Sequence, residues 1–175
     1  DRKEKLFYIF WASTVPGAFP EIPTSASEKG LNHKLYYVTT KDFNTFSETR
    51  LFYNPGFSVI DGTMMERNNR YYMFVKNENS NPAEKNIRVV SNNKPFKFPN
   101  KVSAPITGNY WAEGPASLQV YFDMYRDKKY GAVRSSDMIN WEDVSDSVTF
   151  PKGIRHGTAF IVTESVFNQL IKQKN

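Results

Sequence analysis

Cysteine is absent from the 175-residue chain, which excludes disulfide bonds and thiolate metal sites. No apolar run reaches the length of about 18 residues that a membrane-spanning helix needs. The chain has 23 Lys and Arg residues and 18 Asp and Glu residues, which gives a formal net charge of +5. The basic residues never form a continuous run. Nucleic-acid binding favours a clustered basic stripe, so we expect no nucleic-acid partner and no membrane span. No signal peptide opens the sequence, which indicates mature or trimmed sequence.

Aromatic residues are abundant instead and make up 15% of the chain. They occur in short runs bounded by Asn, Asp, Gly, Pro or Ser, such as KLFYIFWAS, KLYYVTT, RYYMFVKN and YGAVRSS. Runs of this length and composition predict β-strands. Only residues 163–174, TESVFNQLIKQK, have helical spacing, with Val166, Phe167, Leu170 and Ile171 on one face. The sequence therefore predicts an all-β chain with a short C-terminal helix.

Three segments of the chain repeat one pattern of strand, polar turn and aromatic residue. They are YVTTKDFNTF (37–46), VVSNNKPFKF (89–98) and AVRSSDMINW (132–141). The final aromatics are Phe46, Phe98 and Trp141, and counting 15 residues onward from each reaches Asp61, Glu113 and His156. Each of these three residues is followed by Gly, in DGTMM, EGPAS and HGTAF. The constant offset indicates one supersecondary unit that occurs three times.

Repeats of about 40–50 residues with four strands are typical of β-propeller blades. In a propeller the first strand of each blade lies nearest the axis, so equivalent residues at the starts of these strands converge at one mouth of the central channel. We therefore expect Asp61, Glu113 and His156 to lie around one mouth. A Gly after each lets the backbone approach closely where the strands crowd.

The chain holds fewer strands than a closed propeller, which needs at least about four blades. We count three strands of one blade, two full or nearly full blades and the first strand of another. Residues 1–175 are accordingly expected to be a single β-propeller catalytic domain, incomplete at the N-terminus. SLQV also runs into YFDMY without turn residues, so we expect a short connection to be missing between Val120 and Tyr121.

Two carboxylates that face each other are the minimal equipment for glycoside hydrolysis, one protonated and one ionised. Trp111 and Tyr110 precede Glu113 and offer apolar faces for a sugar. Desolvation and a neighbouring Asp61 carboxylate would both raise the pKa of Glu113, which favours Glu113 as the general acid and Asp61 as its charged modulator.

Simpler interpretations stay open for each of these residues. An acidic residue before Gly in a β-protein is often a turn residue, and an isolated His is often a satisfied core residue. His33 is interpreted as a surface residue. Asp42 and Asp137 recur at one turn position and are interpreted as turn formers. Arg126 lies in the solvated turn RDKK, from which it could reach a ligand.

FSVIDGTMM, YWAEGP, YGAVRSSDMINWEDV and RHGTAF, in this order, resemble family 43 glycoside hydrolases. The resemblance covers nearly the whole chain and is greatest to the arabinofuranosidase and xylosidase branch. It implies a five-bladed β-propeller, of which this chain covers roughly three blades. It also implies an inverting enzyme that releases arabinose or xylose from plant polysaccharides, and a secreted or periplasmic location.

The resemblance also implies roles for individual residues. Glu113 matches the general acid, and Asp61 matches the residue that raises the pKa of the acid and orients it. His156 matches an axial histidine that contacts a water or metal ion, so an axial calcium or sodium ion is left open and no cofactor is required. Arg155 beside it would face the sugar. The general base is an Asp of the first blade, and the motif that carries it is outside this chain.

Alternatives to an arabinan- or xylan-degrading hydrolase remain at this point. The first is a catalytically silent propeller that binds glycans. The second is a propeller hydrolase that acts on fructosides. The third is a protein-interaction propeller, which would need no axial carboxylates. No obligate protein partner is inferred, and an oligo- or polysaccharide is the expected ligand.

Overall fold

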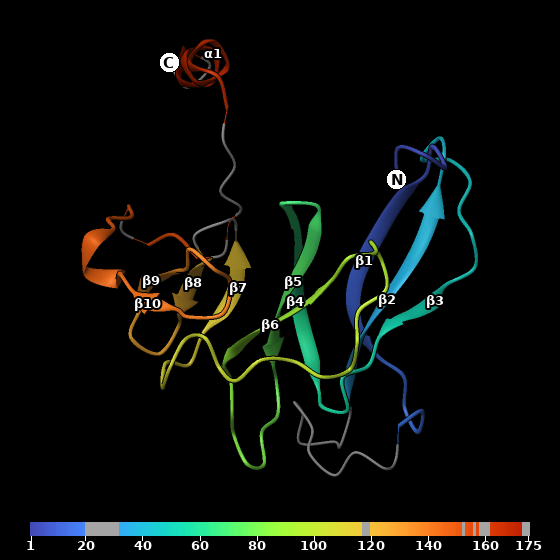
Figure 1. Cartoon of the computed structure of the whole chain (residues 1–175), viewed down its shortest axis with the longest axis horizontal. Helices are drawn as coiled ribbons and strands as arrows, with labels where there is room; N and C mark the ends of the chain where they lie inside the picture. Colours follow the sequence, from blue (N-terminus) through green and yellow to red (C-terminus); the bar gives the residue numbers. More distant parts are fainter. Residues whose placement is uncertain (20–31, 117–119, 152, 156, 158–161, 173–175) are drawn as a thin grey trace.

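The fold is made of three antiparallel sheets that follow one another along the chain (Figure 1). The computed structural model describes residues 1–19, 32–116, 120–151, 153–155, 157 and 162–172. Within these residues no sheet closes on itself, and one short helix, α1 (Glu164–Lys172), follows the sheets. The expectation of a mostly-sheet chain with a short C-terminal helix is confirmed.

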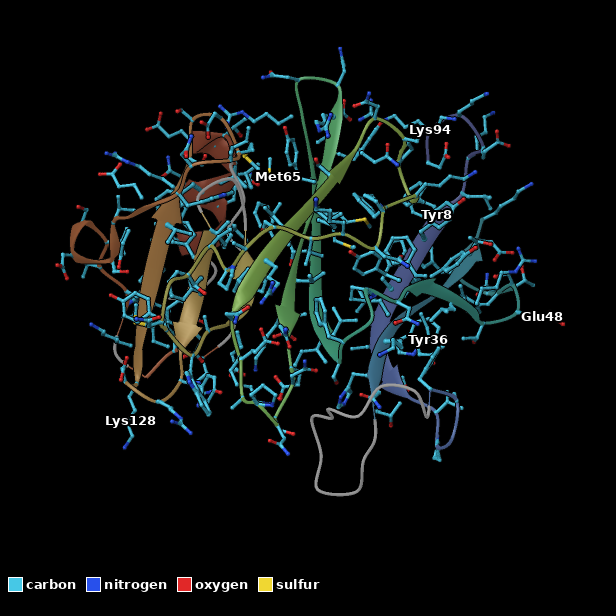
Figure 2. All side chains as sticks on the ribbon, turned by 60° about the horizontal axis from the view of Figure 1, so that its bottom comes forward. Tyr8, Tyr36, Glu48, Met65, Lys94 and Lys128 are labelled. Atoms are coloured by element: carbon cyan, nitrogen blue, oxygen red, sulfur yellow. The ribbon has the colours of Figure 1, made fainter. Side chains whose placement is uncertain are left out.

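The first sheet contains β1 (Phe7–Thr14), β2 (His33–Thr40) and β3 (Arg50–Tyr53), in that order. Eight consecutive residue pairs join β1 to β2, from Phe7 opposite Thr40 to Thr14 opposite His33. Aromatic residues alternate along β1, so Tyr8 and Phe10 face the turn after β6, where the Tyr8 ring lies 4.1 Å from that of Phe96. Figure 2 labels Tyr8 on β1 and Lys94 in the turn after β6, both toward the same side of the view.

The second sheet contains β4 (Val59–Arg67), β5 (Arg70–Asn77) and β6 (Ile87–Asn92). The chain then continues through 101–107 without a regular strand, but it still bonds to β6. Ser103 N donates to Val89 O at 2.9 Å, and Ile106 N donates to Ile87 O at 2.9 Å. This segment therefore occupies the outer position that β3 holds in the first sheet.

The third sheet has the order β10-β9-β8-β7, with four strands against three in each of the other two sheets. Its strands are β7 (Glu113–Ala116), β8 (Val120–Met124), β9 (Lys129–Arg134) and β10 (Glu142–Asp143). A 3-10 turn, η1 (Ser145–Ser147), follows β10.

The expected break between Val120 and Tyr121 is wrong, because both residues belong to β8. They pair without interruption with Val133 and Ala132 of β9. β7 ends at Ala116, so the connection between the two strands lies within 117–119, outside the described residues. The sequence assigned Val120 to the wrong strand because SLQV carries no turn residue to mark the boundary.

The repeat found in the sequence has a direct structural counterpart. Segments 37–46, 89–98 and 132–141 begin in β2, β6 and β9, which are the strands that follow β1, β5 and β8. Each then turns through one residue with positive φ, namely Phe43 (58°), Phe96 (59°) and Met138 (62°). The three sheets are therefore versions of one unit.

Asp42 and Asp137 form these turns, as the sequence predicted. Asp42 Oδ1 accepts hydrogen bonds from the backbone N–H groups of Asn44 and Thr45, both at 2.9 Å. Asp137 Oδ1 accepts them from Ile139 and Asn140, both at 2.8 Å. The bonds from Thr45 and Asn44 lower the pKa of Asp42 to about 2, and the corresponding bonds lower the pKa of Asp137. Both carboxylates stabilise local backbone and take no part in a site.

The middle sheet is buried on both faces, and β5 shows why. Successive side chains of a strand point to opposite faces. Met73 and Val75 pack toward the first sheet, in a cluster with Leu35. Phe74 packs toward the third sheet, in a cluster with Phe122 and the other members Ile87, Val89, Ile106, Ala112, Val120, Met124, Val133 and Met138. The next residue on the Phe74 face is Lys76, and this alternation directs Lys76 toward the third sheet.

Helix α1 stands apart from the three sheets in Figure 1, and none of its residues is buried. The face predicted from its spacing is present, and its apolar side chains are about half exposed: Val166, Phe167, Leu170 and Ile171.

His33, interpreted from the sequence as a surface residue, is half-buried at the start of β2. Its backbone N–H donates to Ser58 Oγ at 3.0 Å, and its Nδ1 lies 3.4 Å from the same oxygen. Burial is the main cause that lowers the pKa of His33, and the nearby ammonium groups of Lys34, Lys85 and Lys76 act in the same direction. The surface interpretation failed because the partner of His33, Ser58, is distant in sequence.

We expect His33 to make folding stability depend on pH. Its pKa is lower in the folded than in the unfolded protein, so the unfolded state binds the proton first. The contribution of neutral His33 to the free energy of unfolding is fully present above the unfolded pKa of about 6.5, and it is lost as pH falls below that value. Thermal unfolding between neutral and mildly acidic pH should therefore show a shallower decline in melting temperature for His33→Asn than for the unchanged protein. Equal slopes for the two proteins would contradict this prediction.

Candidate active site

Asp61 and Glu113 lie at matching irregularities in the inner strands β4 and β7. The pairing register shifts between Ile60 and Thr63 in β4 and between Glu113 and Ala116 in β7. Asp61 has a φ of 53° and Gly114 a φ of 62°, which are left-handed conformations. β-Bulges of this kind re-aim side chains and are frequent next to active sites. Both strands are thus distorted near the aligned acidic residues, with the left-handed conformation on Asp61 itself in β4 and on the Gly that follows Glu113 in β7.

The two bulges are bonded to each other across the sheets. The backbone N–H of Gly114 donates to Asp61 Oδ2 at 3.0 Å. Thr63 Oγ1 donates to Pro115 O at 2.6 Å. Asp61 therefore holds the residue that follows Glu113, so the two acidic residues that the sequence singled out lie side by side. The Gly after Asp61 is needed as well, because a Cβ on Gly62 would lie 2.7 Å from Leu35 Cδ1.

Both carboxyl oxygens of Glu113 are bound by cations. Oε2 lies 3.1 Å from Lys76 Nζ of β5, and Oε1 lies 3.0 Å from Arg155 Nη2. The Glu113 side chain is largely buried, with 16% exposed. Opposite charges at this distance favour the ionised carboxylate, which opposes the proton that the sequence analysis expected Glu113 to hold.

Each of these cations has a second carboxylate partner. Arg155 Nε donates to Asp123 Oδ2, and this hydrogen bond is the main cause that raises the pKa of Arg155. Lys76 Nζ lies 2.7 Å from Glu78 Oε2, and Glu78 Oε1 lies 2.7 Å from Lys85 Nζ. Six side chains of alternating sign therefore form one continuous series, which we call the charge chain: Lys85, Glu78, Lys76, Glu113, Arg155 and Asp123.

Four members of the charge chain were missed by the sequence analysis: Lys85, Glu78, Lys76 and Asp123. One signal was available for Lys76, since strand alternation in RYYMFVKN places it on the same face as Tyr72 and Phe74. A Lys on the core face of a strand is rarely buried without a partner. Asp123 in YFDMY is a similar lone charge within an aromatic strand, paired in register with Glu113.

Trp111 and Arg126, both predicted to bind substrate, lie beside each other near this chain. The Arg126 guanidinium sits 3.1 Å from the centroid of the Trp111 ring. The Trp111 ring lies 6.2 Å from that of Tyr125, and the Lys76 ammonium lies 5.0 Å from the Tyr125 centroid. Trp111, Tyr125 and Arg126 therefore form an aromatic and cationic flank next to Lys76.

Tyr110 does not join this group. Its hydroxyl bonds to Asp143 of β10, which is the main cause that raises the pKa of Tyr110, and its ring packs 6.1 Å from Phe122. The backbone turns here, because Tyr110 N donates to Thr107 O at 3.1 Å. Tyr110 is therefore near Glu113 in the sequence, but its side chain lies elsewhere.

His156 lies outside the described residues, so its predicted position at the mouth stays a prediction. Within the part of the chain that the structure describes, no three His, Asp or Glu side chains gather as metal ligands.

Two hollows bear on where a ligand could bind. One of about 210 Å³ is lined by Asp61 together with apolar side chains that include Trp11, Phe52 and Met73. A larger one of about 960 Å³ lies away from the charge chain, near the β4–β5 turn, and includes Arg67, Arg134 and Trp141. Asp61 therefore borders the smaller of these two hollows.

The fold is a series of repeated antiparallel β-sheets, and the bulged inner strands of two of them carry the acidic residues Asp61 and Glu113. The chain belongs to a family described as a probable glycosyl hydrolase domain, related to glycoside hydrolase family 43, whose sequence model matches residues 1–167. The family indicates a glycoside hydrolase type of function and a carbohydrate substrate. Comparison with curated protein sequences finds no match.

In the described part of the chain, no helix has both the length and the apolar character required to cross a membrane.

We expect the bond from Gly114 to Asp61 to contribute measurably to stability. Asp61→Ala leaves the Gly114 N–H without its partner and places Ala in a left-handed conformation, so it should destabilise by about 1–3 kcal/mol. Asp61→Asn keeps an accepting oxygen and tolerates positive φ better, so it should cost clearly less. Denaturant unfolding of both variants measures the difference. Equal losses of unfolding free energy for Asp61→Ala and Asp61→Asn would show that the hydrogen bond from Gly114 does not contribute to stability.

Proposed function

We propose that this domain is the core of an inverting glycoside hydrolase that acts on arabinose- or xylose-containing plant polysaccharides, as an α-L-arabinofuranosidase, β-xylosidase or endo-xylanase. The observation that carries the proposal is the cross-sheet bond from Gly114 to Asp61, which joins the two bulged inner strands that carry Asp61 and Glu113. The family of the chain supports the class of reaction. Xylan and arabinan as substrates, and secretion of the protein, belong to the proposal.

In this mechanism Glu113 is the general acid and protonates the departing sugar oxygen. Asp61 orients the β7 bulge through Gly114 and is the proposed modulator of Glu113. The general base is an Asp outside this chain that deprotonates the attacking water. An inverting pair needs room for that water, so base and acid should lie about 6.5–9.5 Å apart.

Arg155 and the pair of Trp111 and Arg126 are the proposed sugar contacts. The Arg155 side chain is 54% exposed, although its head is bonded to Asp123 and Glu113. A sugar hydroxyl that bonds to Arg155 would draw it from Glu113 and remove one of the two cations that favour the ionised form. Substrate binding would in this way prepare Glu113 to carry a proton.

The proposed architecture is a five-bladed propeller in which each sheet is one blade. The inner strands β4 and β7 lie next to each other where the second and third sheets meet, and β1 lies next to β4 (Figure 1). The first sheet has no counterpart of β4 or β7 in the described residues, and β1 is its edge. A further inner strand beside β1 would complete that blade and carry the general base.

A catalytically silent glycan-binding propeller is the second candidate. The specific observation in its favour is the double ion pair of Glu113, because an ionised carboxylate cannot act as an acid. This candidate predicts binding of arabinose- or xylose-containing oligosaccharides without hydrolysis.

The direct test is Glu113→Gln in the protein that carries this chain together with the segment preceding it. Acid catalysis supplies about 10²–10⁴ of the rate, so hydrolysis of natural arabinan or arabinoxylan should fall by that factor. Nitrophenyl arabinosides and xylosides, whose leaving groups need less protonation, should be affected less.

Glu142→Gln is the matched control, because Glu142 is an exposed carboxylate of the same sheet that pairs with Arg134. It should leave both rates unchanged. Undiminished hydrolysis of the polysaccharides by Glu113→Gln would reject the acid role. Oligosaccharide binding without any hydrolysis by the unchanged protein would favour the silent propeller.

A further inference from the structure

We propose that Lys76 is the positioning residue of Glu113 and determines which of its two carboxyl oxygens carries the catalytic proton. The catalytic role of this proton rests on the proposed function, whereas the contact between Lys76 and Glu113 does not depend on any reaction. Lys76 belongs to a different sheet from Glu113 and stands 37 residues before it in the chain.

The ammonium of Lys76 is held from several sides. It lies 3.1 Å from Glu113 Oε2, 2.7 Å from Glu78 Oε2 and 5.0 Å from the centroid of the Tyr125 ring. Only 3% of the Lys76 side chain is exposed. A buried side chain with three fixed neighbours has little freedom to move, so Oε2 of Glu113 is fixed with it.

Lys76 keeps its charge in this buried position. Burial alone would lower the pKa of Lys76, but hydrogen bonds and ion pairs with Glu78 and Glu113 outweigh burial and raise it. Glu78 is itself anchored, because its backbone N–H donates to Ser58 O at 2.7 Å and its carboxylate binds Lys85. Lys76 is therefore a permanent cation on a fixed support.

The other oxygen of Glu113 faces a different kind of cation. Arg155 binds Oε1 at 3.0 Å, and its side chain is 54% exposed, against 3% for Lys76. A polar ligand that arrives from solvent reaches Arg155 first and has no access to Lys76. The two oxygens of one carboxylate are thus bound by one fixed and one displaceable partner.

This asymmetry decides where a proton can sit. A Lys ammonium donates three hydrogen bonds and accepts none. Oε2 keeps accepting from Lys76 in every state, whereas Oε1 loses its donor when a ligand draws Arg155 away, so the proton of the acid is favoured on Oε1. That oxygen lies on the exposed side, where a leaving sugar oxygen would have to be.

Other charged and titratable groups also face Glu113 and are part of its environment. β8 contributes Asp123, β4 contributes Asp61 through Gly114, and β5 is followed by Glu78. The phenols of Tyr125 and Tyr130 also interact electrostatically with Glu113. Among the described residues, the cations Lys76 and Arg155 contact its carboxyl oxygens.

The test is an NMR titration of the ¹³C-labelled Glu113 carboxyl group in this chain, for the unchanged protein, Lys76→Met and Lys76→Arg. An opposite charge in contact lowers the ionisation midpoint of a carboxyl group by about 1–3 pH units. Lys76→Met should therefore raise the midpoint of Glu113 by that amount, and Lys76→Arg should restore most of it. Lys85→Met is the matched control, because Lys85 is buried and pairs with Glu78 without touching Glu113, and its effect should be smaller.

A reciprocal measurement covers the case in which Lys76→Met fails to fold. Glu113→Gln should lower the midpoint at which the Lys76 amine titrates, because the ammonium loses one of its two carboxylates. Unchanged midpoints in both experiments would overturn the proposal. Shifted midpoints in a protein that hydrolyses no glycoside would uphold the role of Lys76 and reject the proposed function instead.

Discussion

The ammonium of Lys76 inside the interface between the second and third sheets is the constraint on which the site depends. An unpaired buried charge is strongly unfavourable, whereas a paired and hydrogen-bonded one is tolerated. Lys76 is directed into this interface by the alternation of β5 and must find carboxylates there. Glu78 supplies one from its own sheet and Glu113 the other from the next. The position of Glu113 is thus fixed by the charge balance of the interface as much as by its own strand.

The bulges in β4 and β7 complete the arrangement from the backbone side. They place Asp61 where it accepts the N–H of Gly114, so the second sheet holds the third at two points close together. One point is a backbone hydrogen bond and the other an ion pair, and Glu113 lies between them. The same interface contains the apolar cluster around Phe74 and Phe122, which supplies the burial that makes both polar contacts rigid.

Local sequence patterns were sufficient for the strands, the terminal helix and the repeat that aligns Asp61 with Glu113. These features depend on composition and on spacing along one chain segment. Lys76 and Asp123 were missed because their partners come from other elements, so their role depends on pairing register and sheet packing. The position of Tyr110 could not be predicted either, because a turn at Thr107 directs its side chain to Asp143, and its predicted contact with substrate stays a prediction. Val120 was assigned to the wrong strand because no turn residue marked the start of β8.

The central proposal is that the sugar binds at Glu113 and Asp61 and not in the larger hollow lined by Arg67 and Trp141. A crystal structure of the protein that carries this chain, with a bound iminosugar of arabinose or xylose configuration, tests it most directly. We expect the anomeric end of the ligand to lie against Glu113 Oε1, on the side where the leaving oxygen would be, with Arg155 moved onto the ligand and Lys76 still bound to Oε2. An iminosugar seated instead in the larger hollow lined by Arg67 and Trp141, with Glu113 untouched, would contradict it.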